Sequence, residues 1–174
     1  MPIVNTLGWP HILIAFVAIE RLAELVHSRR NTQALLRRGG QETGAGHYPL
    51  FVALHGCWLI ALAVYAPSSL APNWPLLAAF AILQALRVWV IVSLGPFWTT
   101  RVITIDREPP VGKGPYRYFR HPNYLVVALE IPVLSLALGL PWVALAFGAL
   151  NVALLLYRIK VENAARQRIA PSNR

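Results

Sequence analysis

The chain has 174 residues, of which 56% are hydrophobic and only 13% are charged, and its formal net charge is +9. That length accommodates one domain, and so little polar surface excludes an ordinary soluble protein. The basic residues gather beside long apolar stretches, which is typical of membrane proteins and argues against a nucleic-acid partner. We therefore expect a single membrane domain over residues 1–174, without an internal disulfide because Cys57 is the single cysteine.

Five apolar segments approach the length that a helix needs to cross a bilayer. In chain order they are about Leu7–Val26, Tyr48–Tyr65, Trp74–Leu94, Tyr124–Gly139 and Leu140–Tyr157. Only the turn around Pro141 separates the last two, so we expect them to form a tight antiparallel hairpin. The sequence thus predicts an all-α integral membrane protein with about five transmembrane helices. The first segment contains Glu20, Arg21 and Glu24, and a tilted or half-inserted helix is the alternative there.

The connections between these segments differ in charge, which predicts the orientation of the chain. Lys and Arg occupy the first and third connections and the C-terminal tail, whereas residues 1–9, residues 66–73 and the last turn carry none. Because basic loops stay in the cytoplasm, we expect the N-terminus outside and the C-terminus in the cytoplasm. The first helix is expected to continue beyond the membrane until glycines end it. The third connection contains VITIDREPP, which we interpret as an extended cytoplasmic cover too short to form a sheet.

Ionisable side chains in apolar segments are candidates for function, because they are costly to place in a membrane. Glu20, Glu24 and His27 share one helical face, and His47 opens the second segment. These residues lie toward the cytoplasmic ends, which predicts a polar pocket that opens to the cytosol and that lipid reaches sideways. Glu20, Glu24 and His47 are therefore candidate catalytic residues, because their side chains can accept and donate protons.

The structural alternative for these residues stays open. Glu20 or Glu24 can instead pair with Arg21 or Arg87 and hold helices together. His55, which lies within the second apolar segment, is more typical of a packed, hydrogen-bonded histidine than of a ligand.

The densest polar and aromatic stretch is GPYRYFRHPNYL, residues 114–125, directly before the fourth apolar segment. It resembles the C-terminal signature of the isoprenylcysteine carboxyl methyltransferase family, integral-membrane enzymes that use S-adenosylmethionine. YRIKVENAAR, residues 157–166, looks like the closing helix of that family, with Asn163 where a second acid is usual. ERLAELVHSRRN, GHYP and LGPFWTTRVI look like a bacterial subgroup associated with type III polyketide synthases, which methylates alkylpyrone or alkylresorcinol hydroxyls.

The resemblance implies that S-adenosylmethionine binds within about residues 94–168, between the third connection and the facing helix ends. The expected cofactor-binding residues are Lys113, Gly114, Tyr116, Arg117, His121, Pro122, Tyr124, Arg158 and Glu162. Basic side chains suit the cofactor carboxylate, Glu162 suits its ammonium or ribose, and aromatic rings suit its adenine or sulfonium. Arg120, in the same motif, joins the candidate catalytic residues, and no metal site is expected.

The resemblance therefore implies O-methylation of a long-chain alkylpyrone or alkylresorcinol, with the active site at the cytoplasmic face of a bacterial inner membrane. The expected partners are this lipophilic small molecule and membrane lipid. Carboxyl methylation of an isoprenylcysteine-type substrate is the alternative, because a carboxylate is already ionised. A nicotinamide-dependent membrane reductase, a haem protein with histidine ligands and a non-enzymatic adaptor are further alternatives. The oligomeric state is left open.

Overall fold

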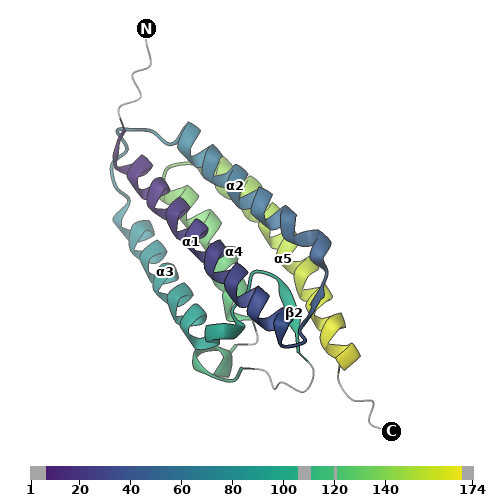
Figure 1. Cartoon of the computed structure of the whole chain (residues 1–174). Helices are drawn as coiled ribbons and strands as arrows, with labels where there is room; N and C mark the ends of the chain where they lie inside the picture. The colour runs from purple at the N-terminus through teal and green to yellow at the C-terminus, as the bar shows by residue number, and fades with distance from the viewer. Residues whose placement is uncertain (1–6, 106–110, 120, 170–174) are drawn as a thin grey trace.

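The computed structural model describes residues 7–105, 111–119 and 121–169. These residues form five α-helices that lie lengthwise against one another, with successive helices running in opposite directions (Figure 1). The helices are α1 (Trp9–Arg37), α2 (Tyr48–Tyr65), α3 (Trp74–Leu94), α4 (Pro122–Ala137) and α5 (Pro141–Ile169). The predicted mostly helical fold is thereby confirmed.

Three stretches within the described residues are long and apolar enough to cross a membrane, namely Ala45–Tyr65, Trp74–Phe97 and Pro141–Ala165. Helix α4 is apolar but shorter, with 16 residues. Helix α1 has acidic and basic residues in its middle. The chain is therefore an integral membrane protein, whereas the five-span arrangement and its orientation stay predictions.

Each helix has a proline in its first turn, and this explains where the helices begin. The residues are Pro10, Pro49, Pro75, Pro122 and Pro141. A first-turn residue has no intrahelical partner for its N–H, so proline costs no hydrogen bond there and its fixed φ suits the helix. Helix α1 continues to Arg37, as expected, and ends before Gly39, whose φ is +87°.

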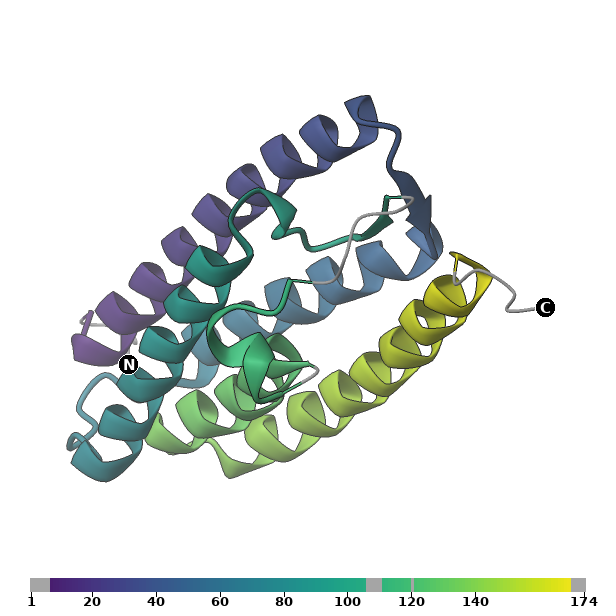
Figure 2. The same cartoon turned by 90° about the horizontal axis from the view of Figure 1, so that it is seen from below.

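A small antiparallel sheet corrects the interpretation of the VITIDREPP stretch. Strand β1 (Gln41–Thr43) pairs with β2 (Val102–Thr104), with Gln41 opposite Thr104. Each strand has three residues, and the partner strand comes from the distant connection after α1, which the local pattern does not reveal. Figure 2 shows the connection after α3 crossing the middle of the bundle on its way to this sheet.

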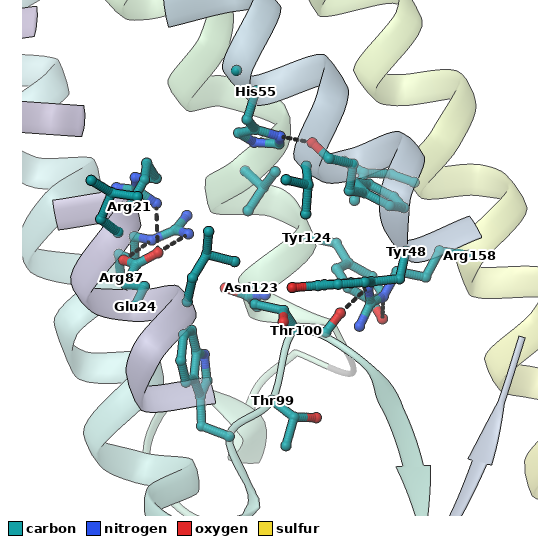
Figure 3. Close-up of a pocket in the computed structure, with 18 of the residues that line it drawn as sticks. Arg21, Glu24, Tyr48, His55, Arg87, Thr99, Thr100, Asn123, Tyr124 and Arg158 are labelled. Atoms are coloured by element: carbon teal, nitrogen blue, oxygen red, sulfur yellow. Dashed lines mark hydrogen bonds and ion pairs between the residues drawn. The ribbon is translucent and has the colours of Figure 1, made fainter. Parts of the chain in front are cut away.

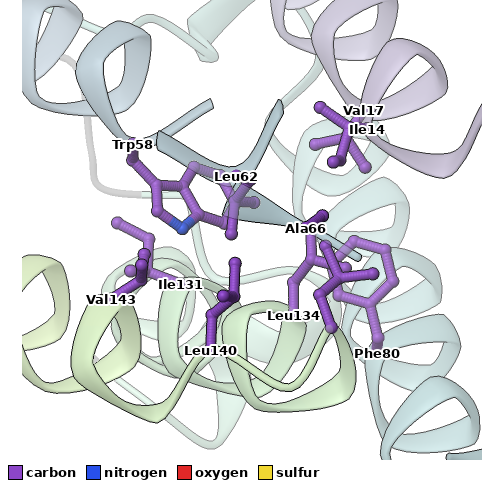
Figure 4. Close-up of a cluster of buried hydrophobic side chains, with 11 residues drawn as sticks. Ile14, Val17, Trp58, Leu62, Ala66, Phe80, Ile131, Leu134, Leu140 and Val143 are labelled. Carbon is purple, nitrogen blue, oxygen red and sulfur yellow. The ribbon is translucent and has the colours of Figure 1, made fainter. Parts of the chain in front are cut away.

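The apolar core lies in the half of the bundle away from the sheet. Trp58 and Leu62 of α2 pack against Ile131 and Leu134 of α4, and all four are fully buried (Figure 4). The Trp58 Nε1 donates to Ser135 Oγ at 3.0 Å, so the indole buries no unpaired polar atom. This half is closely packed, and the cavities described next lie in the other half.

Candidate functional site

Two cavities lie next to each other in the half of the bundle that carries the sheet. The larger, which we call the apolar cavity, has a volume of about 330 Å³ and is lined mainly by α1 and α2. The smaller, the polar cavity, has a volume of about 190 Å³ and is lined by residues 94–104, η3 (Gly114–Arg117), α4 and α5. Trp98, Thr99, Asn123, Tyr124 and Arg158 line both cavities, and we call them the shared wall (Figure 3).

The cytoplasmic extension predicted for α1 positions part of this wall. Asn31 Nδ2 donates to the backbone carbonyls of Trp98, at 2.8 Å, and Gly95, at 3.1 Å. The Thr100 N–H donates to Ser28 Oγ at 2.7 Å. These bonds satisfy backbone groups of an irregular segment, so the connection after α3 has a fixed path beside both cavities.

The two sequence motifs, residues 114–125 and 157–166, meet at Tyr124. Its hydroxyl donates to Glu162 Oε2 at 2.6 Å and accepts from Arg158 Nε at 3.0 Å. Arg158 also donates through Nη1 to the Thr100 carbonyl at 2.6 Å. The motif before α4 and the motif at the end of α5 are therefore joined through one phenol, and Arg158 extends that link to the connection after α3.

Aromatic and imidazole rings complete the polar cavity. The His121 ring stacks on Tyr124 with 5.2 Å between centroids and 9° between planes. His121 Nδ1 lies 4.0 Å from Glu162 Oε2, and Tyr116 adds another ring to the lining. Five expected cofactor-binding residues thus meet in one cavity, namely Tyr116, His121, Tyr124, Arg158 and Glu162.

Four other expected cofactor-binding residues do not line either cavity. Lys113 and Arg117 are exposed, and Pro122 is buried in the first turn of α4. Gly114 has a φ of +55°, and a Cβ there would collide with Ser93 Oγ. The glycine is therefore required for the contact between η3 and α3 rather than for an approaching ligand. Arg120, an expected catalytic residue, lies outside the described residues.

A buried network of charges joins α1, α3 and α4, and Arg21, Glu24 and Arg87 of this network line the apolar cavity. Arg87 of α3 donates through Nη2 to Glu24 Oε2 at 2.6 Å and through Nη1 to Glu130 Oε2 at 3.0 Å. Arg21 donates to the same two carboxylates at 3.0 and 2.8 Å, and Gln84 Nε2 donates to Glu130 Oε1 at 2.8 Å. Two guanidinium groups and two carboxylates thus neutralise one another between α1, α3 and α4, as burial requires.

This network favours the structural interpretation of Glu24. Its carboxylate lines the apolar cavity, but both of its oxygens accept from arginines, as in a structural ion pair. Glu20 lies 3.9 Å from Arg21 and outside the lining of both cavities. His47 is buried against the rings of Phe51 and Tyr157 and is also absent from the described lining. The geometry therefore does not bring the three candidate catalytic residues together.

The structure adds residues that the sequence interpretation missed. His55 lines the apolar cavity, and Asn123 and Trp98 belong to the shared wall. Asn123 Oδ1 and Trp98 Nε1 are buried, and neither has a hydrogen-bond partner among the described residues. Asn123 lies inside the quoted motif and Trp98 inside LGPFWTTRVI, so their positions were visible in the sequence although their unpaired atoms were not.

Comparison with known proteins is consistent with this geometry. Residues 76–168 match the Isoprenylcysteine carboxyl methyltransferase (ICMT) family, a range that includes all the described lining residues of the polar cavity and both motifs. A protein of Bacillus subtilis (strain 168), named "Uncharacterized protein YpbQ", is 34% identical over 160 residues, which cover 90% of this chain and 95% of that protein. No solved structure matches the chain.

Proposed function

Since the chain belongs to the isoprenylcysteine carboxyl methyltransferase family, and is thus a membrane methyltransferase, we propose that it transfers a methyl group from S-adenosylmethionine to the hydroxyl oxygen of a lipophilic acceptor. The acceptor that suits the site best is a long-chain alkylpyrone or alkylresorcinol. The observation that carries this proposal is the shared wall, at which a polar cavity built from the family's motifs adjoins an apolar cavity.

The described residues of the polar cavity fit S-adenosylmethionine chemically. Arg158 is a cation suited to the cofactor carboxylate, and Glu162 is an anion suited to its ammonium. The unpaired Asn123 Oδ1 is a buried acceptor that a ligand N–H or O–H would satisfy. The rings of Tyr116 and His121 offer surfaces for adenine. When bound, the cofactor supplies an electrophilic methyl group to the acceptor oxygen.

The protein's own contribution is mainly positioning. The bonds among Tyr124, Arg158 and Glu162 fix the polar side chains before a ligand arrives, so little ordering is required on binding. Holding the two reactants next to each other where the two cavities adjoin converts a bimolecular reaction into an effectively intramolecular one. Apolar side chains of α1 and α2 line the larger cavity and lower the polarity around the acceptor.

The apolar cavity supports a lipophilic acceptor. Its lining includes Leu22 of α1, which is 62% exposed, and Val52 of α2, which is 39% exposed. In a membrane protein such side chains face lipid, so the cavity reaches the bilayer between these two helices. An acceptor with a long alkyl chain then enters without crossing water, while its polar head reaches the shared wall.

Carboxyl methylation is the second candidate, and Arg158 favours it. This guanidinium lines the apolar cavity as well as the polar one and is a suitable partner for an acceptor carboxylate. The family description refers to that reaction, and it requires no base. A direct comparison of acceptors therefore decides between the two reactions.

The test uses the full chain in detergent micelles, with S-adenosylmethionine labelled in its methyl group. We expect the label to appear in an alkylresorcinol with a long chain, in preference to an S-prenylcysteine. Isothermal titration calorimetry measures cofactor binding separately. Failure of the folded protein to bind the cofactor would overturn the methyltransferase proposal, and label found in the prenylcysteine alone would leave carboxyl methylation instead.

We also propose that the polar cavity faces the cytoplasm of a bacterial inner membrane. The support is the charge of the connections, because the basic residues Arg29, Arg30, Arg37 and Arg38 lie at the same end of the bundle as the sheet. The test is labelling of single cysteines in intact cells with a thiol reagent that does not cross membranes. A cysteine at Ser68 should react and one at Gln41 should not, and the reverse pattern would overturn this orientation.

A further inference from the structure

His55 is a titratable residue that the motifs do not include. It lies on α2 and lines the apolar cavity, as Figure 3 shows. The ring of Trp58 meets it edge to face, with 6.2 Å between centroids. The imidazole is thus held in place inside the cavity where the proposed function puts the acceptor.

The hydrogen bond of His55 defines which ring nitrogen carries the proton. His55 Nδ1 lies 2.9 Å from the carbonyl oxygen of Phe51. Because a carbonyl only accepts, Nδ1 must be the donor, and in the neutral ring the lone pair is then on Nε2. Nε2 has no hydrogen-bond partner among the described residues. The side chain therefore presents a proton acceptor of fixed orientation.

Phe51 connects this imidazole to the shared wall. While its carbonyl accepts from His55, its ring lies 5.6 Å from the Arg158 guanidinium carbon. His55 is one helical turn from Phe51, a rise of about 6 Å for four residues. The cavity volume of about 330 Å³ accommodates a ring-sized head group together with part of an alkyl chain.

The other ionisable groups that line the apolar cavity are already engaged. Both Glu24 oxygens accept from arginines, and the Tyr124 hydroxyl donates to Glu162. The Tyr48 ring lies against Arg101, 4.6 Å from the guanidinium carbon. Among the described ionisable residues of this lining, His55 is therefore the one whose basic nitrogen, Nε2, is paired with no arginine or other side chain.

Resting on the proposed function, we propose that His55 is the catalytic base, and that the acceptor is consequently a neutral lipid with an acidic hydroxyl, of the phenol or enol class. The acceptor O–H bond breaks, its proton goes to the Nε2 lone pair, and the electron pair of that bond stays on oxygen as phenolate or enolate. The imidazole becomes a cation with both nitrogens protonated, and it returns its proton to water after product release. A carboxylate acceptor, already ionised, would leave this residue without a role.

The experiment compares the wild-type protein with His55→Asn. The asparagine amide can still donate to the Phe51 carbonyl, but it has no atom in the place of Nε2. We expect unchanged cofactor affinity by calorimetry and at least about a hundredfold lower turnover of an alkylresorcinol, the size of a lost general base. The wild-type rate should rise with pH as the imidazole loses its proton, and the variant should lack that rise. His11→Asn, in the first turn of α1 and outside both cavities, is the matched control.

Other charged groups around His55 also influence how the rate depends on pH. Those that surround it are Arg21 and Glu24 of α1, Arg87 of α3, Glu130 of α4 and Arg158 of α5. All five are paired or hydrogen-bonded within the protein. A rise that persists in His55→Asn would therefore be assigned to one of these groups and would overturn the proposal.

A second readout does not depend on activity. A 4-nitrophenol with a long alkyl chain absorbs differently when ionised, and we expect it to ionise at lower pH in wild-type protein than in His55→Asn. If the variant does not fold, nitrogen-15 NMR of histidine in wild-type protein decides, because His55 Nε2 must gain a proton when the phenol binds. No such gain, or equal turnover by both proteins, overturns the role of His55. Loss of cofactor binding by wild-type protein would instead overturn the proposed function itself.

Discussion

Two groups of charged side chains lie close together in this protein, and they differ in the partners that balance their charges. In the network of Arg21, Glu24, Arg87 and Glu130, two cations meet two anions between three helices. In the group of Tyr124, Arg158 and Glu162, the side chains border a cavity and lie beside the unpaired Asn123 Oδ1. A closed network stabilises a fold, whereas an open one has capacity for a ligand.

Removal of one cation from the closed network of Arg21, Glu24, Arg87 and Glu130 should give the largest loss of stability. In Arg87→Met, Glu24 and Glu130 lose a shared partner inside the protein, and we expect about 3–5 kcal/mol less stability. Denaturant unfolding in detergent micelles measures the change. The double variant Arg87→Met/Glu24→Gln should recover part of the loss, because it removes one of the uncompensated charges. Wild-type stability in the single variant would show that this network does not hold the helices.

Substitutions in the open group, which is Tyr124, Arg158 and Glu162, should lower the affinity for the cofactor more than the stability of the fold. Glu162→Gln keeps the shape of the side chain but removes the charge proposed to face the cofactor ammonium. We expect S-adenosylmethionine to bind about 10–100-fold more weakly, the range for a lost charge-assisted hydrogen bond. Calorimetry gives the affinity, and unfolding should shift by less than in Arg87→Met. Equal affinity for wild type and variant would remove Glu162 from the cofactor site.

A smaller change is expected where only the link within the open group is cut. Tyr124→Phe removes the hydroxyl that connects Arg158 to Glu162 but keeps the ring that stacks on His121. A neutral hydrogen bond contributes about 1 kcal/mol, so we expect cofactor affinity to fall about two- to tenfold. Tyr118→Phe, which is exposed and outside the polar cavity, is the matched control for this measurement. A loss as large as that of Glu162→Gln would mean that the hydroxyl itself contacts the ligand.

Loss of the ion pair at the sheet should change the stability of the protein least. Arg101 Nη1 donates to both oxygens of Glu42 at 2.9 and 3.0 Å, but the arginine side chain is 39% exposed. Exposed pairs contribute about 0–1 kcal/mol, so Glu42→Gln should change unfolding by no more than that, and less at high salt. A loss comparable to that of Arg87→Met would contradict the distinction between buried and exposed pairs.

Much of the fold could be predicted because its signals are local. Apolar runs of helical length and first-turn prolines determine α2 and α3, whose bounds match the predicted segments Tyr48–Tyr65 and Trp74–Leu94. The β1–β2 pairing could not be predicted, since each strand has three residues and its partner is far away in the chain. A pattern of alternation carries no information about which distant segment supplies the hydrogen bonds.

The candidate site was predictable only in part. The motif residues Tyr116, His121, Tyr124, Arg158 and Glu162 were named from sequence, and the structure brings them to one cavity. Glu24 was named as a possible base from its spacing along the helix. That spacing shows only that Glu24 shares a helical face with Glu20 and His27. Spacing along one helix does not reveal that Arg87, from another helix, binds its carboxylate. For the same reason His55 looked like an ordinary packed histidine.

The sequence by itself determined the membrane class, the helices and the family motifs, because hydropathy, proline position and motif spacing act over short distances along the chain. Tertiary structure decided which ionisable groups are neutralised by charges from other helices and which are not. That outcome depends on partners contributed by different helices, as when Glu24 meets Arg87 while the Nε2 of His55 meets no partner among the described residues. Whether a buried charge stabilises the fold or is available to a ligand is a property of the whole packed arrangement.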